Sequence, residues 1–463
     1  MIRLFKVSIP SNVIALVVSE IVLVFSCYLL AAYLTFDVAP DVFLIDDGGL
    51  WHITLVVGVI ILGIYFHDLY EDFRVSSQIL LLQQVSLVLG MAFVLQAALS
   101  YARSSYLLPK WLMVYGSLGV LVLLPGWRIL FAEVVSKALG AQGILFLGSS
   151  QAVREIIAHI AERSDLGLAA LGYLDQEESA PEEICGVRLL GGMADLRQIV
   201  AEQRPDRIVV GMTERRNRLP MEQLLQLRLS GVHIEEAAVT FETLFHRVST
   251  RDLRPSQLIF STELGPRPQS VAMQSVYSWL LGLIVLVVTL PIMALVALLI
   301  KLTSPGPALF RQTRVGLGGA TFTLFKFRSM YQDAEARTGA VWAVRDDPRI
   351  TPLGRWLRRL RLDELPQLFN VIRGEMSVVG PRPERPEFVE ILQERIPFYV
   401  QRHCIKPGIT GWAQINHKYG DTIEDSLKKL EYDLYYIKNL ALSLDAYIIF
   451  HTAKTMLLGR GAQ

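Results

Sequence analysis

The chain has 463 residues, of which 52% are hydrophobic and only 19% are charged, and its formal net charge is +1. This balance is more apolar than that of an ordinary soluble protein, and the near-zero charge gives no reason to expect nucleic acid as a partner. The three cysteines, Cys27, Cys185 and Cys404, are far apart and form no metal-ligand spacing, which fits packing roles in a reducing compartment.

The first 138 residues are predicted to form four transmembrane helices. A bilayer core needs about 20 apolar residues per helix. Basic residues at positions 3, 6, 74, 128 and 137 mark one side, so the positive-inside tendency places the N-terminus and the segment after residue 137 in the cytoplasm. The alternative, helices buried in a soluble core, is less favoured because four such stretches follow in a row. The apolar stretches are residues 12–33, 51–66, 79–99 and 110–131.

A small doubly wound α/β module is expected over residues 140–262. A buried strand at 143–147 enters a helix at 152–162, and strands at 169–174 and 207–210 alternate with a helical pattern at 193–203. The turn at Gly148 lacks the full GxGxxG series, so dinucleotide binding is disfavoured. A structural or regulatory Rossmann-like module is the favoured interpretation.

One more membrane segment, besides the four N-terminal helices, is expected in the last part of the chain, residues 268–463. Residues 268–300 contain no charge, and 277–300 is long enough to span a bilayer. Pro291 removes a backbone hydrogen bond inside this segment and should kink its helix. Both flanks are basic, with Arg267 before and Lys301 after. A re-entrant helix that bends at Pro291 keeps both flanks cytoplasmic, whereas a true crossing does not.

Adjacent carboxylates at Asp363 and Glu364 are the main chemical signal. Neighbours on a helix diverge by about 100°, so one can attack an electrophile while the other holds a metal. Pro366 suits the first turn of a helix, whose N-terminus would stabilise the negative charge. The plain alternative is a water-facing helix cap. The arginines around the pair favour an anionic substrate such as a diphosphate.

Five segments, in order, resemble the bacterial polyprenyl-phosphate sugar-1-phosphate transferases, the monotopic phosphoglycosyl transferases of the exopolysaccharide-priming type. The resemblance covers about residues 270–463. Four N-terminal crossings plus a Rossmann-like module resemble the large form of that family, with a mainly α catalytic domain and a re-entrant membrane helix. The five segments are residues 326–330, 347–349, 354–367, 374–384 and 406–414.

The resemblance implies an enzyme that transfers sugar 1-phosphate from a UDP-sugar to polyprenyl (undecaprenyl) phosphate, releasing UMP, as the first step of exopolysaccharide synthesis. Asp363 would be the nucleophile of a covalent aspartyl intermediate, and Glu364 would be catalytic and hold Mg²⁺. Arg358 and Arg382 are implied phosphate contacts. Two more substrate-binding candidates, which could instead be surface charge, are Lys326 and Arg328.

The implied setting is the bacterial inner membrane, with the catalytic domain on its cytoplasmic side. Membrane lipid, polyprenyl phosphate and a UDP-sugar are the expected partners, and self-association into a homo-oligomer is left open. No partner among nucleic acids is expected.

Three positions depart from the family pattern: the first leaves the helix break to the proline alone, and the last two weaken any assignment of the sugar. Leu290-Pro291 replaces a common Ser-Pro, Leu360-Arg361 replaces Thr-Ser, and Asn416-His417 replaces Asn-Gly. His403 and His417 are interpreted as polar surface residues rather than bases. Trp412 and Gln414 lie in the last of the five segments, and the alternative is that they only shape a turn. Competing functions are an NAD-dependent sugar-nucleotide enzyme and a non-enzymatic scaffold.

Overall fold

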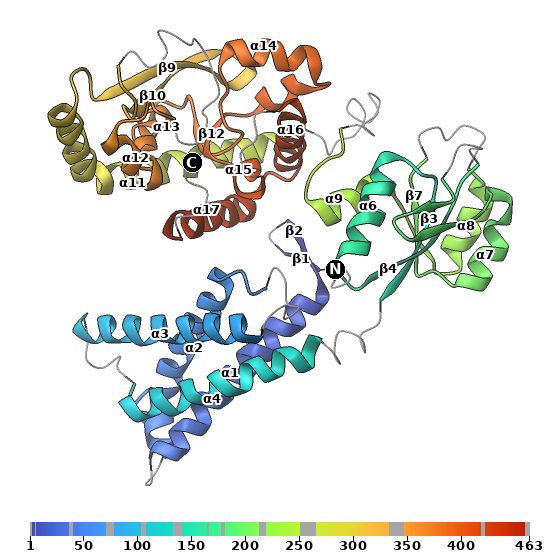
Figure 1. Ribbon diagram of the computed structural model, residues 1–463, viewed down its shortest axis with the longest axis horizontal. Coiled ribbons are helices and arrows are strands. Elements are labelled where there is room, and N and C mark those ends of the chain that lie inside the picture. The colour runs from blue at the N-terminus through green and yellow to red at the C-terminus, as the bar shows by residue number, and fades with distance from the viewer. Residues whose placement is uncertain are drawn as a thin grey trace. The chain divides into compact units, whose positions relative to one another are not determined.

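The protein is represented by a computed structural model, which describes residues 2–4, 6–36, 40–70, 78–102, 108–132, 141–163, 166–176, 181–212, 219–250, 265–332, 347–417 and 422–458. Two compact units divide the chain near residue 235. The first comprises residues 8–149 and 153–235 with the first three residues, and the second comprises residues 236–463 with residues 4–7 and 150–152. Each part is described by itself below (Figure 1).

The predicted N-terminal apolar stretches all form helices. After the short strands β1 (Ile2–Leu4) and β2 (Val7–Ile9), they are α1 (Ser11–Thr35), α2 (Gly49–Phe66), α3 (Gln78–Ala102) and α4 (Lys110–Leu130), with a π-helical turn at Val42–Asp46. Length and composition allow α1, α2 and α4 to cross a membrane, and within α3 the stretch 81–97 is apolar but shorter. The membrane orientation of these helices stays a prediction.

A buried ion pair joins α1 to α4. Arg128 donates from Nε to Oε1 of Glu20 at 2.6 Å, and both side chains are inaccessible to solvent. The hydroxyl of Tyr70 donates to the other carboxylate oxygen of Glu20 at 2.6 Å. Arg128 is therefore a paired residue inside the bundle, and its use as a marker of the cytoplasmic side stays a prediction.

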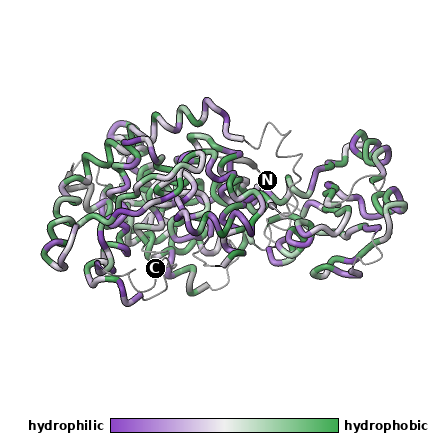
Figure 2. The backbone as a smooth tube through the Cα atoms, turned by 90° about the horizontal axis from the view of Figure 1, so that it is seen from above, coloured by the Kyte–Doolittle hydropathy of each residue, from purple (hydrophilic) through white to green (hydrophobic). Residues whose placement is uncertain are grey.

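The α/β part contains a six-stranded sheet, as its alternating sequence pattern predicts. The strand order is β5-β6-β4-β3-β7-β8. The pairs β6–β4, β4–β3 and β3–β7 are parallel, and the pair β5–β6 is antiparallel. Helices α6, α7 and α8 connect the strands, and hydrophobic and hydrophilic segments alternate through this part at the right of Figure 2. The alternating α/β pattern is confirmed, while the Rossmann-like role stays a prediction. The elements are β3 (Gln142–Leu147), α6 (Gln151–Glu162), β4 (Leu168–Leu174), β5 (Glu183–Ile184), β6 (Val187–Gly191), a 3-10 turn at Met193–Asp195, α7 (Leu196–Gln203), β7 (Arg207–Val210), α8 (Met221–Leu229) and β8 (His233–Glu236).

The second unit is mainly helical, as predicted, with two small pairs of strands. An antiparallel hairpin joins β9 to β10, and β11 pairs with β12 in parallel. Its elements are α9 (Ala237–Phe245), α11 (Pro268–Thr303), β9 (Leu309–Val315), a 3-10 turn at Leu317–Gly319, β10 (Thr321–Phe327), α12 (Pro352–Arg359), η7 (Leu362–Glu364), α13 (Gln367–Ile372), β11 (Ser377–Val379), α14 (Pro386–Arg395), η8 (Tyr399–Cys404), β12 (Gly408–Thr410), α15 (Trp412–Asn416), α16 (Ile423–Lys438) and α17 (Leu442–Leu457).

Helix α9 packs within the second unit, next to α16. Arg247 pairs with Glu431 of α16 at 2.9 Å, and Lys438 of the same helix pairs with Glu242 at 2.9 Å. The indole of Trp412 donates to the carbonyl of His246 at 2.8 Å. Trp412 is therefore a buried core residue and does not only shape a turn.

Helix α11 runs without interruption from Pro268 to Thr303 and contains Pro291. The ribbon of α11 changes direction along its length (Figure 1). Both halves pack on the second unit: Gly282 approaches Val371 of α13, and Met293 and Ile300 lie in a cluster with residues of β10 and α12. Its outer side is largely exposed and apolar, so the helix also has the composition of a membrane segment. The re-entrant path stays a prediction.

Candidate active site

The two adjacent carboxylates lie on the 3-10 turn η7, between α12 and α13. Arg361 has a left-handed backbone with φ of 56°, a conformation that costs a non-glycine residue about 1 kcal/mol and turns the chain sharply after α12. Pro366 is the N-cap of α13, one position earlier than the sequence predicted. Asp363 and Glu364 are only 8% and 9% exposed, which excludes the water-facing cap as their role.

Glu364 is held by two cationic side chains. Its Oε1 accepts from Lys326 Nζ at 3.2 Å and from Arg382 Nη2 at 3.3 Å, so three of the predicted site residues meet at one oxygen. Burial alone would raise the pKa of Glu364, but the charges of Lys326, Arg382 and Arg361 outweigh it and lower the pKa to about 2. Glu364 is therefore ionised throughout the working pH range.

Asp363 has the opposite electrostatic setting. Burial and the neighbouring charge of Glu364 raise the pKa of Asp363 above its ordinary value, and the charges of Lys326, Arg358 and Arg361 offset only part of that rise. A carboxylate with a raised pKa is more basic than an exposed one. Two neighbouring carboxyl groups with pKa values moved in opposite directions suit two different chemical roles.

Arg358 stands on α12, the helix that leads into the carboxylate turn. Thr351 caps this helix by accepting from the backbone N–H of Gly354 at 2.9 Å, and Leu357 anchors it in the core. Arg358 donates from Nε to Ser329 Oγ at 2.9 Å, and burial lowers its pKa while the charges of Asp363 and Asp347 oppose that shift. The guanidinium thus belongs to the same electrostatic site as Asp363.

Arg328 is placed differently from the other predicted cations. Its guanidinium donates to the carbonyls of Ser304 and Pro305 at 2.9 and 2.7 Å, at the C-terminal end of α11. A side chain on Gly306, which has φ of 114°, would collide with this guanidinium. Arg328 therefore ties the end of the apolar helix to β10, and its role as a substrate contact stays a prediction.

The segment that carries Arg382 is fixed by hydrogen bonds to four successive carbonyls. The carbonyl of Pro381 accepts from the N–H of Gly408 at 2.9 Å, and that of Glu384 accepts from the N–H of Val315 at 2.9 Å. Arg402 Nη2 donates to the carbonyl of Arg382 at 3.0 Å, and Arg314 Nη1 donates to that of Pro383 at 3.0 Å. Arg314 also lies 3.8 Å from Glu384. The side chain of Arg382 pairs with Glu364.

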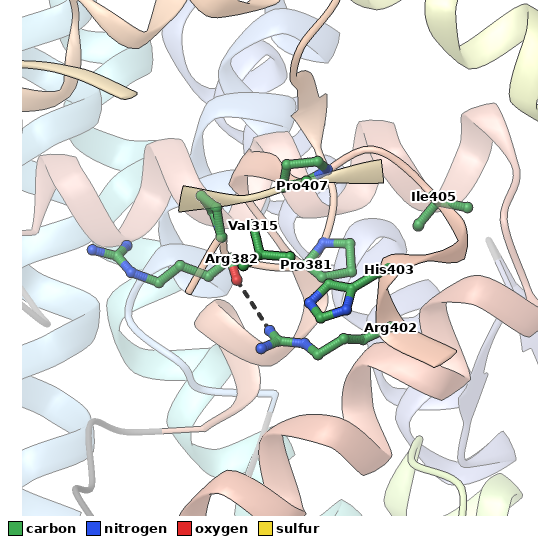
Figure 3. A pocket seen from close by; sticks show the side chains of 9 residues that line it. Val315, Pro381, Arg382, Arg402, His403, Ile405 and Pro407 are labelled. Atoms are coloured by element: carbon green, nitrogen blue, oxygen red, sulfur yellow. Dashed lines mark hydrogen bonds between the residues drawn. The ribbon is translucent and has the colours of Figure 1, made fainter. Parts of the chain in front are cut away.

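A small pocket lies behind this segment (Figure 3). Arg402 and His403 point toward the backbone at Pro381 and Arg382, while the side chain of Arg382 points away from them. His403 is buried, so its interpretation as a surface residue is wrong; burial and the charge of Arg402 lower its pKa to about 4, which leaves it neutral. The other histidine, His417, is half-buried and lies 3.2 Å from Asp425.

The sequence did not single out Arg402 and Asp433, which support the site. Neither lies in a segment with a chemical signature. They are 31 positions apart in the sequence, yet Arg402 Nη2 lies 2.8 Å from Asp433 Oδ2. A buried ion pair between distant elements leaves no local pattern. Only the burial of α16 against η8 in the fold brings these two residues together.

The described residues could supply a magnesium ion with only one or two carboxylate ligands. Among them there is no group of three or more His, Cys, Asp or Glu side chains positioned for a metal. Mg²⁺ keeps several waters and is usually bound by one or two carboxylates together with substrate phosphates, so a large ligand cluster is not required. Both cationic contacts of Glu364 use the same oxygen, Oε1. The carboxylate pair therefore fits a magnesium ion that arrives with a diphosphate.

The site is a buried carboxylate pair among cationic side chains, on a unit with a long apolar helix. This combination defines a membrane-associated enzyme for a phosphorylated substrate. A family model described as bacterial sugar transferase matches residues 269–459.

Three curated relatives agree with this match. A protein of Aeromonas hydrophila named UDP-N-acetylgalactosamine-undecaprenyl-phosphate N-acetylgalactosaminephosphotransferase is 45% identical over 50% of this chain and 53% of its own, so this chain spans about half the length of that relative. The UDP-glucose:undecaprenyl-phosphate glucose-1-phosphate transferase of Xanthomonas campestris pv. campestris is 33% identical over 70% of this chain and 68% of its own. The exopolysaccharide production protein PSS of Rhizobium leguminosarum bv. phaseoli is 44% identical over 38% of this chain and 91% of its own.

The chain belongs to the bacterial sugar transferase family, the polyprenyl-phosphate sugar-1-phosphate transferases. The resemblance drawn from the five sequence segments is thereby confirmed.

Proposed function

We propose that the protein transfers sugar 1-phosphate from a UDP-sugar to undecaprenyl phosphate and so begins the synthesis of a polysaccharide. The observation that supports this most directly is the opposite electrostatic setting of Asp363 and Glu364 on one turn. The relatives from Aeromonas and Xanthomonas are named for this kind of transfer, from UDP-N-acetylgalactosamine and UDP-glucose respectively.

In the first step, the ionised Asp363 attacks the phosphorus that bears the sugar. A bond forms between its carboxylate oxygen and that phosphorus, and the bond from the phosphorus to the oxygen of UMP breaks. UMP leaves with the electron pair, and the sugar 1-phosphoryl group remains on the aspartate as an acyl phosphate. Burial favours this step because it makes the Asp363 carboxylate more basic.

In the second step, an oxygen of undecaprenyl phosphate attacks the same phosphorus. The bond to Asp363 breaks, the carboxylate is restored and the lipid diphosphate sugar is released. The same phosphorus therefore changes partner twice, and no external base is needed because both nucleophiles are already ionised.

The cationic side chains offset the charge of the diphosphate. Lys326, Arg358 and Arg382 surround the carboxylate turn, and the guanidinium of Arg382 matches a pair of phosphate oxygens. When bound, a magnesium ion would supply further charge compensation for the leaving UMP, with Glu364 as its protein ligand. The anchored end of α11 would keep this site at the membrane surface, where the lipid phosphate lies.

The direct test is UMP release by the purified protein, with undecaprenyl phosphate, magnesium and a panel of UDP-sugars. We expect release with at least one sugar, and a donor labelled in its sugar-bearing phosphate should leave label on the protein when the lipid acceptor is omitted. Release without any protein-bound label would contradict the aspartyl intermediate, and no release with any donor would contradict the transfer itself.

A further inference from the structure

We infer that the buried pair Arg402 and Asp433 positions Arg382 for the donor diphosphate. This role rests on the proposed function, because it assumes that Arg382 contacts the donor. The contacts that the described part of the chain gives these two residues do not include the carboxylate turn, so both are positioning residues and not catalytic ones.

The guanidinium of Arg402 connects three groups: the Asp433 carboxylate, the Tyr399 hydroxyl and the Arg382 carbonyl. Its guanidinium contacts Asp433 Oδ2 at 2.8 Å from Nη2 and 3.1 Å from Nε, donates to the hydroxyl of Tyr399 at 2.7 Å, and donates to the carbonyl of Arg382 at 3.0 Å. Arg402 and Asp433 are 5% and 1% exposed. A planar guanidinium can serve several acceptors in fixed directions, whereas an ammonium acts as a compact point charge.

Arg402 holds the backbone of Arg382, whereas the side chain of Arg382 contacts Glu364. Arg402 approaches the Arg382 carbonyl from one side, while the side chain of Arg382 leaves in the opposite direction (Figure 3). That side chain is 31% exposed and contacts Glu364 at 3.3 Å, so its position depends on the peptide that carries it. Fixing the peptide therefore limits the guanidinium to a small volume, which lowers the ordering cost when a diphosphate binds.

The test compares Arg402→Lys in two backgrounds. The lysine keeps the charge beside Asp433 but cannot bridge to both Asp433 and the Arg382 carbonyl. We expect it to lower kcat/KM for the UDP-sugar about tenfold in the otherwise unchanged protein, and by less than about twofold when Arg382 is already alanine. Equal losses in both backgrounds would mean that Arg402 acts by general support of the fold, and the inference would fall.

A second measurement does not depend on turnover. Amide hydrogen exchange of Gly408 and Val315, whose N–H groups donate to the carbonyls of Pro381 and Glu384, should be faster in Arg402→Lys than in the wild type. The exposed control Arg395→Lys should leave it unchanged. Unaltered exchange in Arg402→Lys overturns the positioning role. If the wild type releases no UMP, the proposed function fails, and the exchange result still decides whether Arg402 fixes this segment.

Discussion

The chemistry of this protein depends on how two neighbouring acids are distinguished. Glu364 has its compensating charges within hydrogen-bond distance, whereas Asp363 has them around it without a comparable contact. The sequence indicated the pair and most of its cations, because adjacent acids followed by Pro366 and flanked by arginines form a local pattern. It could not indicate which acid would be more basic, since that follows from burial and from Lys326, which lies 38 positions away from Glu364.

Replacing Asp363 by asparagine should abolish transfer while the protein stays folded. The amide has nearly the same size but cannot form the acyl phosphate, so we expect turnover to fall by at least about 10³-fold. Loss of the protein-bound label should accompany the loss of UMP release. Glu390→Gln, which changes an exposed carboxylate on α14, is the matched control and should remain active. Near-normal turnover of the asparagine variant would remove Asp363 from the mechanism.

The same substitution has a consequence for stability that depends on pH. Because the pKa of Asp363 is raised in the folded state, the folded protein binds more protons than the unfolded chain between the ordinary pKa and the raised one. The ionised form therefore destabilises the fold as pH rises through that window. We expect Asp363→Asn to increase Tm at neutral pH, with the gain disappearing below about pH 4. A Tm that decreases at neutral pH would contradict the direction of the pKa shift.

Activity should depend on the shape of the cation at position 382 as well as on its charge. Arg382→Lys is expected to lower kcat/KM about tenfold and Arg382→Ala about a hundredfold, because a charged hydrogen bond is worth about 1.5–3 kcal/mol. Thermal stability should change little, since the side chain is partly exposed. If the lysine variant unfolds in parallel with its loss of activity, Arg382 supports the fold and the phosphate contact should be abandoned.

At the scale of elements, α11 has an apolar side of the kind that suits a membrane and an opposite side that packs on the catalytic unit. Its outer side is apolar, and its inner side packs on α13 near Gly282 and on α12 near Met293 and Ile300. Near its start, Gln274 donates to Asp445 at 3.0 Å and to the carbonyl of Val379 at 3.2 Å. The sequence predicted the apolar segment and the proline, but it gave no information on these polar contacts. They come from residues more than a hundred positions apart.

We expect both ends of α11 to lie on the same side of the membrane. Single cysteines at Gln269 and Thr303, in a background without Cys27, Cys185 and Cys404, should both resist a membrane-impermeant reagent added to intact cells and react after permeabilisation. The basic flanks and the packing of both halves on one unit motivate this expectation. Labelling of position 303 in intact cells would show a true crossing. Pro291→Ala, in the same background, tests whether the proline maintains the bend.

At the scale of the whole molecule, the second unit includes α9 and the residues just after it. Glu431 is buried, and Arg247 and Thr250 both bond to it.

A chain that begins at residue 236 should therefore be more stable than one that begins at residue 265. The shorter form leaves the carboxylate of Glu431 buried without Arg247, and removing one partner of a buried pair costs about 3–5 kcal/mol. Thermal unfolding and UMP release of the two truncated forms would be compared in the same detergent. If both forms have the same Tm and activity, the contacts of α9 do not stabilise the unit. Restoring stability to the shorter form with Glu431→Gln would identify the unpaired charge as the cause.

The pair of Glu20 and Arg128 has a consequence for how the N-terminal helices are made. Glu20 lies on α1, and the cation that neutralises it lies on α4, 108 residues later in synthesis. Until α4 emerges from the ribosome, an acidic group on an apolar helix has no partner of opposite charge. Entry of α1 into the lipid should therefore wait for α4, or be reversed and repeated until α4 arrives. Nascent chains arrested before and after α4 has left the ribosomal exit tunnel would show this order as a change in the resistance of α1 to extraction. Glu20→Gln should remove the difference.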